Sequence, residues 1–163
     1  MASKVYASLF SLFTLTTAVV SAGKIDYHDR NIADDSIALA IKAPRPVSVT
    51  ELVNAMNERY DVNTIEELDI SENTICHKGA EQIFKSSKNY PNLRRINLAF
   101  NRIYDERNGA DYQAFESSLL ELLQRPTLLE IDLRGNGIAN ASWIAYMASR
   151  MSNNQMQKIK WAN

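Results

Sequence analysis

The stretch IEELDISENTI, which runs from Ile65 to Ile75, decides the fold of this chain. Its apolar residues follow two spacings at once, because Ile65 and Leu68 are three residues apart whereas Leu68 and Ile70 are two apart. A helix repeats apolar residues every three or four positions and a strand every two, so neither element alone gives this pattern. The stretch predicts a short strand that the chain enters through a turn.

Two further stretches repeat the pattern. Residues 93–103 (LRRINLAFNRI) and 128–138 (LLEIDLRGNGI) carry apolar residues at positions 1, 4 and 6, asparagine at position 9 and isoleucine at position 11. A partial fourth copy, residues 156–163 (MQKIKWAN), stops before the asparagine position. Self-similarity with a period of roughly 20 to 50 residues is typical of repeat proteins. The asparagines of the three complete copies are Asn73, Asn101 and Asn136.

The repeated pattern resembles the leucine-rich repeat family, whose core motif is LxxLxLxxNxL. The pair Gly79-Ala80, which recurs as Gly109-Ala110, is similar to the pair that opens the helix in the ribonuclease-inhibitor-like subclass. The third copy departs from it with Ala141-Ser142. The resemblance covers about residues 65–163 and implies an α/β leucine-rich repeat solenoid, with a short parallel sheet on the concave side and helices on the convex side.

Each copy is interpreted as a short strand followed by a returning helix. The two apolar residues that are two apart point to one face of the strand. One such unit cannot bury its apolar face alone, so neighbouring units stack and pair their strands in parallel. The asparagine lies where the chain leaves the strand, and its amide can bond loop backbone groups that would otherwise be buried unpaired. We expect Asn73, Asn101 and Asn136 to form a structural ladder.

Helices are expected between the strands. Pro91 closes the first unit and Pro126 the second. Upstream, residues 48–60 begin with a capping box, because Ser48 precedes Glu51 by three residues. The apolar residues at helical spacing are Ile83 and Phe84 in the first unit, Phe115, Leu119, Leu122 and Leu123 in the second, and Trp143, Ile144, Met147 and Met151 in the third.

The N-terminus has the three parts of a secretory signal peptide: Lys4, an uncharged apolar segment from Val5 to Ala22, and small residues at its end that fit a cut after Ala22. An uncleaved anchor is the alternative, because about 18 to 20 apolar residues can span a bilayer. The serine and threonine residues of the segment favour cleavage. We expect a secreted or periplasmic protein that meets a membrane only through this segment, if it is uncleaved.

The predicted domains are therefore a signal peptide (1–22), an N-terminal cap or lead-in (23–47) and a leucine-rich repeat domain (48–163). Within the lead-in, residues 36–41 (SIALAI) are a candidate first strand. The sequon at Asn140 is a glycosylation site only in a eukaryotic host.

Composition and motifs exclude several function classes. With 18 basic and 19 acidic residues among 163, the chain has no general attraction to nucleic acid, and no nucleic-acid partner is expected. Cys76 is the sole cysteine, so an intramolecular disulfide is impossible. His28 and His77 are too isolated for a metal site, and no phosphate-binding loop occurs. No cofactor and no metal are expected.

The adjacent pair Cys76-His77 suggests a nucleophile and a base. Neighbouring residues on an extended segment point apart, however, and the sequence offers no third group to orient them. We expect a small buried cysteine, and we predict that the chain is not an enzyme.

In a parallel stack, the residues that flank the buried strand positions line up in rows on the concave face. The rows are Glu67, Arg95, Glu130 and Lys158; Asp69, Asn97, Asp132 and Lys160; and Ser71, Ala99, Arg134 and Ala162. The alternating charges of the first row suit a self-neutralising ladder that sets the register and equally suit a face that docks a partner. Phe100, just past its strand, either anchors a partner or packs against the loops.

The predicted function is protein binding through the concave face or the adjacent loops. The family resemblance implies this role, whereas the residue chemistry only permits it. A secreted effector that acts in a host cell and a regulator of an enzyme such as a GTPase are the alternatives. The candidate partner-binding residues are Glu67, Asp69, Arg95, Asn97, Phe100, Glu130, Asp132, Arg134, Lys158 and Lys160.

Overall fold

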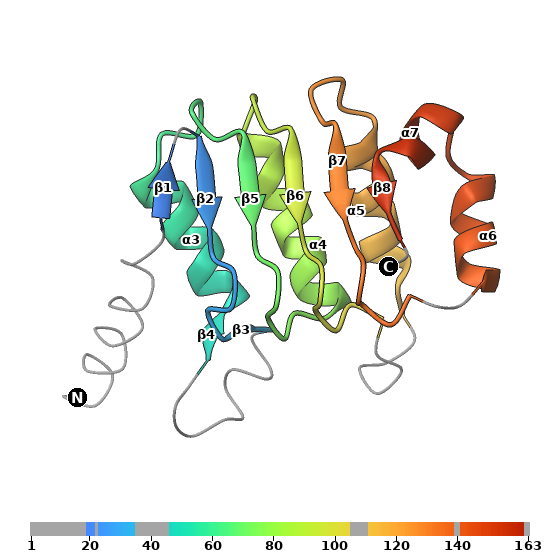
Figure 1. Cartoon of the computed structure of the whole chain (residues 1–163), viewed down its shortest axis with the longest axis horizontal. Helices are drawn as coiled ribbons and strands as arrows, with labels where there is room; N and C mark the ends of the chain where they lie inside the picture. Colours follow the sequence, from blue (N-terminus) through green and yellow to red (C-terminus); the bar gives the residue numbers. More distant parts are fainter. Residues whose placement is uncertain (1–18, 22, 35–45, 105–110, 139–140, 162–163) are drawn as a thin grey trace.

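The computed structural model describes residues 19–21, 23–34, 46–104, 111–138 and 141–161. These residues form a mixed α/β fold with a sheet in the order β1-β2-β5-β6-β7-β8 and a layer of helices (Figure 1). Five neighbouring strands are parallel, and β1 at one edge runs antiparallel to β2. The strands are β1 Val19–Ser21, β2 Lys24–Asp26, β5 Glu67–Asp69, β6 Arg95–Asn97, β7 Glu130–Asp132 and β8 Ile159–Lys160.

The strands pair in the register that the repeated pattern predicts. Leu68 lies beside Ile96, Ile96 beside Ile131, and Ile131 beside Ile159, and all four side chains are buried. Because side chains alternate along a strand, each strand buries its middle residue and turns its neighbours to the other face. The predicted parallel pairing of the three complete copies and of the partial fourth is confirmed.

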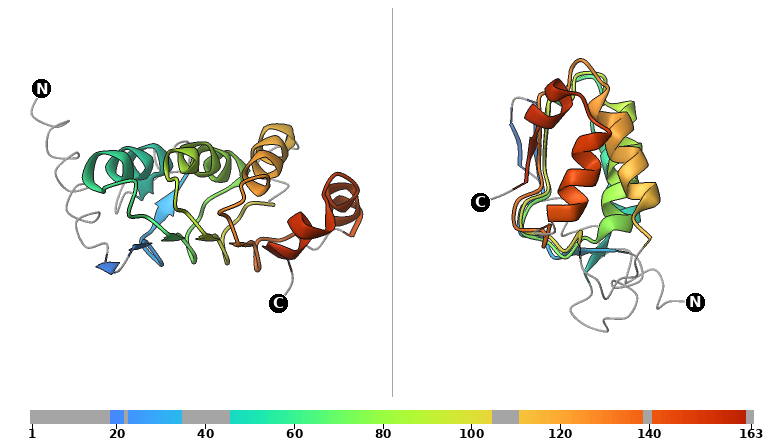
Figure 2. Two further views of the ribbon diagram at one scale, coloured as in Figure 1. Left: turned by 90° about the horizontal axis from the view of Figure 1, so that it is seen from above. Right: turned by 90° about the vertical axis from the view of Figure 1, so that its right-hand side faces the viewer.

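The described helices are α3 Val49–Arg59, α4 His77–Ser86 with the 3-10 turn η1 Ser87–Asn89, α5 Gln113–Leu123, α6 Ala141–Ser149 and α7 Asn153–Gln157. Helices α3, α4 and α5 form a layer that covers one face of the sheet, whereas the short α7 lies beside the start of β8 (Figure 2). The capping box at the start of α3 is confirmed, since the Ser48 hydroxyl accepts from Glu51 N–H at 3.2 Å and Glu51 accepts from Ser48 N–H at 3.0 Å. Among the described residues, no helix has both the length and the apolar composition that crossing a bilayer requires.

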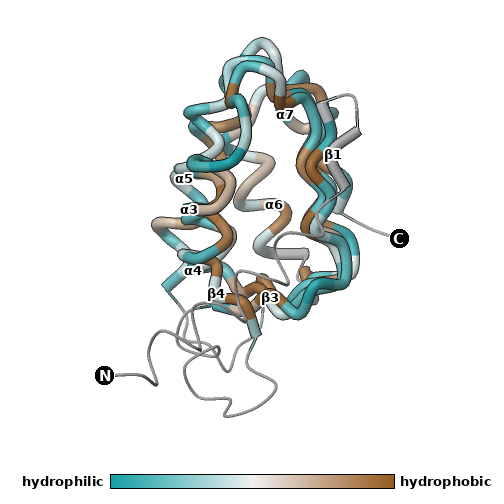
Figure 3. The backbone as a smooth tube through the Cα atoms, turned by 90° about the vertical axis from the view of Figure 1, so that its left-hand side faces the viewer, coloured by the Kyte–Doolittle hydropathy of each residue, from teal (hydrophilic) through white to brown (hydrophobic). Residues whose placement is uncertain are grey.

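A continuous apolar core fills the space between the two layers, and apolar segments belong to both (Figure 3). The rings of Phe84 on α4 and Phe115 on α5 stack with centroids 5.7 Å apart, so neighbouring helices share core contacts. Each fully buried large apolar side chain stabilises the fold by about 1.5–3 kcal/mol relative to exposure. Because the core side chains of each unit pack against those of the next, no unit buries its apolar face by itself.

The first part of the predicted cap or lead-in over residues 23–47 contributes a strand to the sheet, which the sequence interpretation did not predict. Residues 24–26 form β2, which pairs with β5 in the register Ile25 beside Leu68. Ile25, Tyr27 and Ile32 occupy positions 4, 6 and 11 of the repeated pattern and are all buried. Burial of these apolar side chains stabilises the pairing of this segment with the sheet, as it does for the neighbouring strands.

Parts of the predicted signal peptide and of the predicted lead-in lie among the described residues. Val19–Ser21, the end of the predicted signal peptide, forms β1 on the edge of β2. β3 Ile32–Ala33 and β4 Val47–Ser48 form a separate parallel pair. The rest of the signal peptide, the candidate strand at 36–41 and the sequon at Asn140 lie outside the described residues, and the secreted or periplasmic location stays a prediction.

Candidate functional site

The face of the sheet opposite the helices is the candidate site, and we call it the open face (Figure 2). It presents the residues on either side of each buried strand position. A shallow hollow crosses it from β2 to β7. The side chains of the open face are Lys24, Asp26, Glu67, Asp69, Arg95, Asn97, Glu130, Asp132 and Lys160. The structure therefore brings seven of the ten predicted binding residues to one surface, where Lys24 and Asp26 also lie, and two more, Phe100 and Arg134, to its margin.

Ion pairs cross-link neighbouring strands in the first predicted row. Arg95 on β6 pairs with Glu67 on β5, and Lys160 on β8 pairs with Glu130 on β7 at 2.7 Å. These side chains are between one third and one half exposed, so each pair contributes at most about 1 kcal/mol. The contacts fit a self-neutralising ladder, and partial exposure leaves the same groups accessible to a partner.

The second row has a structural role that the sequence interpretation missed. In four successive units the side-chain oxygen at the end of the strand accepts the backbone N–H of the residue two positions on. The four bonds are Asp26 with His28 N at 3.0 Å, Asp69 with Ser71 N at 3.2 Å, Asn97 with Ala99 N at 3.1 Å and Asp132 with Arg134 N at 3.1 Å. Aspartate and asparagine favour such turns because their short side chains reach this N–H. An aspartate or asparagine at position 5 of each of these four units was the available signal.

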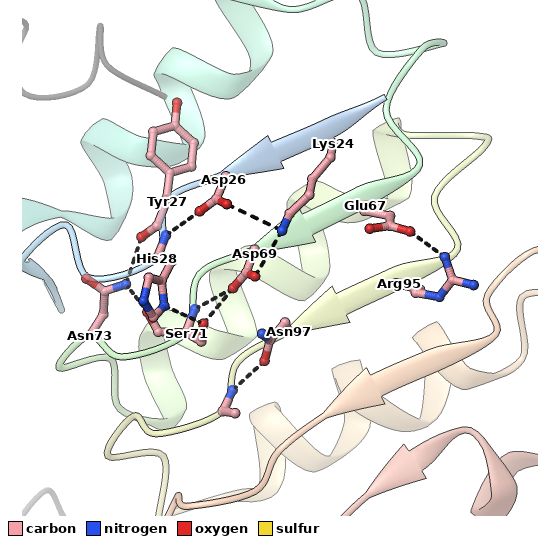
Figure 4. Close-up of polar contacts among 11 residues, drawn as sticks. Lys24, Asp26, Tyr27, His28, Glu67, Asp69, Ser71, Asn73, Arg95 and Asn97 are labelled. Atoms are coloured by element: carbon pink, nitrogen blue, oxygen red, sulfur yellow. Dashed lines mark hydrogen bonds and ion pairs between the residues drawn. The ribbon is translucent and has the colours of Figure 1, made fainter. Parts of the chain in front are cut away.

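Asp69 lies at the centre of a polar network that joins β2 to β5 (Figure 4). Lys24 Nζ is 3.3 Å from carboxylate oxygens of both Asp69 and Asp26. The Ser71 hydroxyl donates to Asp69 at 2.6 Å, and His28 Nδ1 lies 3.0 Å from the same hydroxyl oxygen. Because the serine donates to the carboxylate, His28 Nδ1–H is left to donate to Ser71. Ser71 itself is buried, so this chain of bonds ties two units together.

The network sets the ionisation of Asp69. Burial by itself would raise the pKa of Asp69, but the hydroxyl and backbone N–H of Ser71 bond the charged form. The amide of Asn97 and the charge of Lys24 act in the same direction, and the pKa of this carboxyl lies below its ordinary value. Asp69 is thus held as a carboxylate on the open face.

Asp132 is ionised for a similar reason. Burial would raise its pKa, yet the hydrogen bonds and charge of Arg134 lower it below its ordinary value. Arg134 Nε lies 2.9 Å and 3.0 Å from the two carboxylate oxygens, and its Nη2 lies 2.5 Å from one of them. Arg134 and Asp132 therefore form a bidentate pair that is close to neutral as a unit.

Lys158 does not belong to the open face, so its inclusion in the first row is wrong. Its ammonium donates to the backbone carbonyls of Leu123 at 3.2 Å and Arg125 at 2.9 Å, at the end of α5 on the helix side. Lys158 is the C-cap of α7, and the strand begins only at Ile159. The short last helix delays the strand by one residue, which turns this side chain away.

Phe100 is half exposed, with 52% of its surface accessible. Its φ of 56° lies in the left-handed region, which costs a bulky residue roughly 1–2 kcal/mol. One side of its ring covers Gly135, where an added Cβ would lie 2.9 Å from the Phe100 Cε1 atom. The ring therefore packs on the next loop and also faces solvent, so both predicted roles of Phe100 are compatible with the structure.

A second hollow lies at the carboxyl ends of the strands, beside Phe100, and we call it the rim hollow. Its lining residues are Asp26, His28, Asp69, Ser71, Glu72, Asn97, Ala99, Phe100, Asp132 and Arg134. The left-handed backbone of Phe100 recurs at the same position of the other units, at Asp29, Glu72 and Gly135. This repeated turn places the side chains of neighbouring loops side by side along the rim hollow.

The three repeated asparagines lie in the interior, next to the site. Asn101 accepts from Ile75 N–H in its neighbouring unit at 3.0 Å and donates to the carbonyls of Ile70 at 3.0 Å and Leu98 at 3.1 Å. Asn73 and Asn136 repeat this arrangement with the loops next to them. All three are buried, and they bond loop backbone as the sequence predicts.

Cys76 and His77 lie on the helix side. The Cys76 thiol donates to the buried carboxylate of Asp34, and burial together with that carboxylate raises the pKa of Cys76 to about 12. A thiol with so high a pKa is a poor nucleophile at neutral pH. The His77 ring is buried against Tyr112, with centroids 4.6 Å apart, and burial lowers its pKa. Within the part of the chain that the structure describes, no group of three metal-ligating side chains is close enough to hold an ion.

Comparison with models of known protein families, with curated proteins and with solved structures finds no match to this chain.

Proposed function

We propose that this chain is a leucine-rich repeat protein of the ribonuclease-inhibitor-like type, whose parallel sheet is the concave side of a short solenoid. The support is the recurrence of one motif in successive units whose strands pair in register. The buried asparagine of each motif contacts the adjacent unit, which is what a stacked solenoid requires.

We further propose that the protein binds another protein through the open face and the rim hollow, and that it does so after export. Phe100 carries this proposal. It is a large apolar side chain held in a costly backbone conformation, half exposed, at the margin of a polar hollow. Aromatic residues, phenylalanine among them, are enriched in the buried centre of protein interfaces, which a polar rim surrounds.

The proposal is tested with two matched alanine variants. Phe100→Ala removes the aromatic ring from the rim hollow, whereas Leu129→Ala removes an apolar side chain of similar exposure, 50%, just before β7. Each protein is used as bait to recover partners, and the recovered proteins are quantified by mass spectrometry. We expect recovery of one specific partner with wild type and Leu129→Ala, and its loss with Phe100→Ala. Equal recovery by all three proteins would contradict a binding role for Phe100.

A further inference from the structure

Charge at the rim hollow is unequal on the two sides of Phe100. Toward β7, the Asp132 carboxylate is paired with Arg134. On the other side, Lys24 is shared by Asp26 and Asp69, and Glu72 makes no ion pair with any described residue. The rim hollow is thus lined by four carboxylates and by one arginine, Arg134, whereas Lys24 lines the neighbouring hollow. The excess negative charge lies on the side of Glu72.

Glu72 and Phe100 occupy equivalent positions in adjacent loops. Both have a left-handed backbone, with φ of 55° and 56°, and Glu72 N–H donates to Ala99 O at 2.9 Å. Neighbouring parallel strands are about 4.8 Å apart, so the Glu72 carboxylate and the Phe100 ring lie in adjacent loops of the same hollow. One side of the ring rests on Gly135, and its exposed part faces solvent.

We infer that the partner presents an arginine side chain that stacks on Phe100 and pairs with Glu72. This inference rests on the proposed function. A purely apolar partner that covers Phe100 would also cover Glu72, and burying a carboxylate without a counter-charge costs free energy. A guanidinium offers both contacts at once, because it is planar enough to stack on an aromatic ring and it donates to a carboxylate. An ammonium lacks that flat face, so arginine is preferred over lysine.

The inference is tested by selecting random twelve-residue peptides displayed on phage against the immobilised full-length protein. Binding of the selected peptides is then measured by isothermal titration calorimetry with wild type, Phe100→Leu, Glu72→Gln and the control Leu129→Ala. All four proteins are first checked for equal urea midpoints. We expect arginine to be enriched among the selected peptides. Changing that arginine to lysine should weaken binding about 3-fold or more, and changing it to methionine about 10-fold or more.

Two further results are expected. Glu72→Gln should weaken the arginine peptide but leave its methionine counterpart unchanged, and the affinity of the arginine peptide should fall as the salt concentration rises. If the peptides depend on Phe100 but show no arginine enrichment and no dependence on Glu72, the arginine inference fails while the proposed binding face stands. If selection yields no peptide that depends on Phe100, both the inference and the proposed face are refuted.

Discussion

Replacing Asn101 with alanine removes a side chain that joins two neighbouring strand–helix units. Its amide donates to the carbonyls of Ile70 at 3.0 Å and Leu98 at 3.1 Å, and its oxygen accepts from Ile75 N–H at 3.0 Å. The site is 6% exposed, so water has little access to the groups that lose their bonds. The perturbation is therefore confined to the interior of the stack.

The size of the expected loss in stability depends on which of the groups bonded to Asn101 keep another hydrogen-bond partner. Asn73 still donates to the carbonyl of Ile70 at 3.1 Å, and Asn136 still donates to that of Leu98 at 2.8 Å. Ile75 N–H loses the acceptor that Asn101 provides. Leaving one buried donor unsatisfied costs about 1–3 kcal/mol, and each lost hydrogen bond to a group with a second partner costs about 0.5–1.5 kcal/mol. We expect Asn101→Ala to lower the free energy of unfolding by about 2–6 kcal/mol, the sum of one unsatisfied donor and two lost hydrogen bonds.

The assay is urea denaturation followed by circular dichroism at 222 nm, with the slope m compared between proteins to check that the same surface unfolds. Asn54→Ala, at an exposed position of α3, is the control and should change stability by less than about 0.5 kcal/mol. Asn101→Asp adds a further check. It retains the acceptor for Ile75 N–H but turns an oxygen toward carbonyl oxygens, so it should be at least as destabilising as alanine at pH 7.

Two outcomes would refute this reasoning. A loss below about 0.5 kcal/mol for Asn101→Ala, equal to that of Asn54→Ala, would mean that the amide is not a structural link. Full rescue by Asn101→Asp would mean that only the bond to Ile75 N–H matters.

Three further predictions concern other contacts. Gly79→Ala should destabilise the protein by about 2–4 kcal/mol in urea melts, because a Cβ there would overlap the buried carboxylate of Asp34, which bonds the first turn of α4; an unchanged midpoint would contradict the close approach. His77 has a lowered pKa in the folded protein, so its contribution to stability is complete above its unfolded pKa of about 6.5 and is lost as the pH falls below it, by at most about 1.4 kcal/mol per pH unit. His77→Phe should remove this part of the pH dependence, and parallel stability–pH profiles of the two proteins would count against it. A double-mutant cycle on Glu67 and Arg95 should give a coupling energy of about 0.2–1 kcal/mol at low salt that shrinks in 1 M NaCl, and a salt-independent coupling above 2 kcal/mol would show that the pair is not solvent-screened.

The spacing of apolar residues and asparagine was enough to predict the strands, their parallel order and their register. That success has a physical reason: the buried residue of each strand must face the core, so a pattern that repeats fixes which residues lie beside each other. The unit around β2 was missed because Tyr27 replaces the usual aliphatic residue and Arg30 stands where the asparagine is expected. Ile25 and Ile32 were correctly spaced but did not suffice to identify it.

The candidate site was predicted less completely. Alternation along a strand tells which side chains leave the core, and it correctly brought Glu67 and Arg95 to one face. It cannot tell that Asp69 also closes a turn, because that bond depends on local backbone direction. The left-handed backbone of Phe100 contradicts the preference of the residue and is imposed by its place in the stack. Lys158 was misplaced because the end of α7 shifts the start of the last strand.

The stacking of parallel units in this register is the claim on which the binding face depends, and scalar couplings across hydrogen bonds test it most directly by nuclear magnetic resonance. The account predicts couplings from Tyr27 N to the carbonyl carbon of Asp69, from Ile70 N to that of Asn97, and from Leu98 N to that of Asp132, whose N···O distances are 2.7, 2.8 and 2.9 Å. Couplings that instead join these amides to other partners, or an antiparallel pattern between β5, β6 and β7, would contradict it.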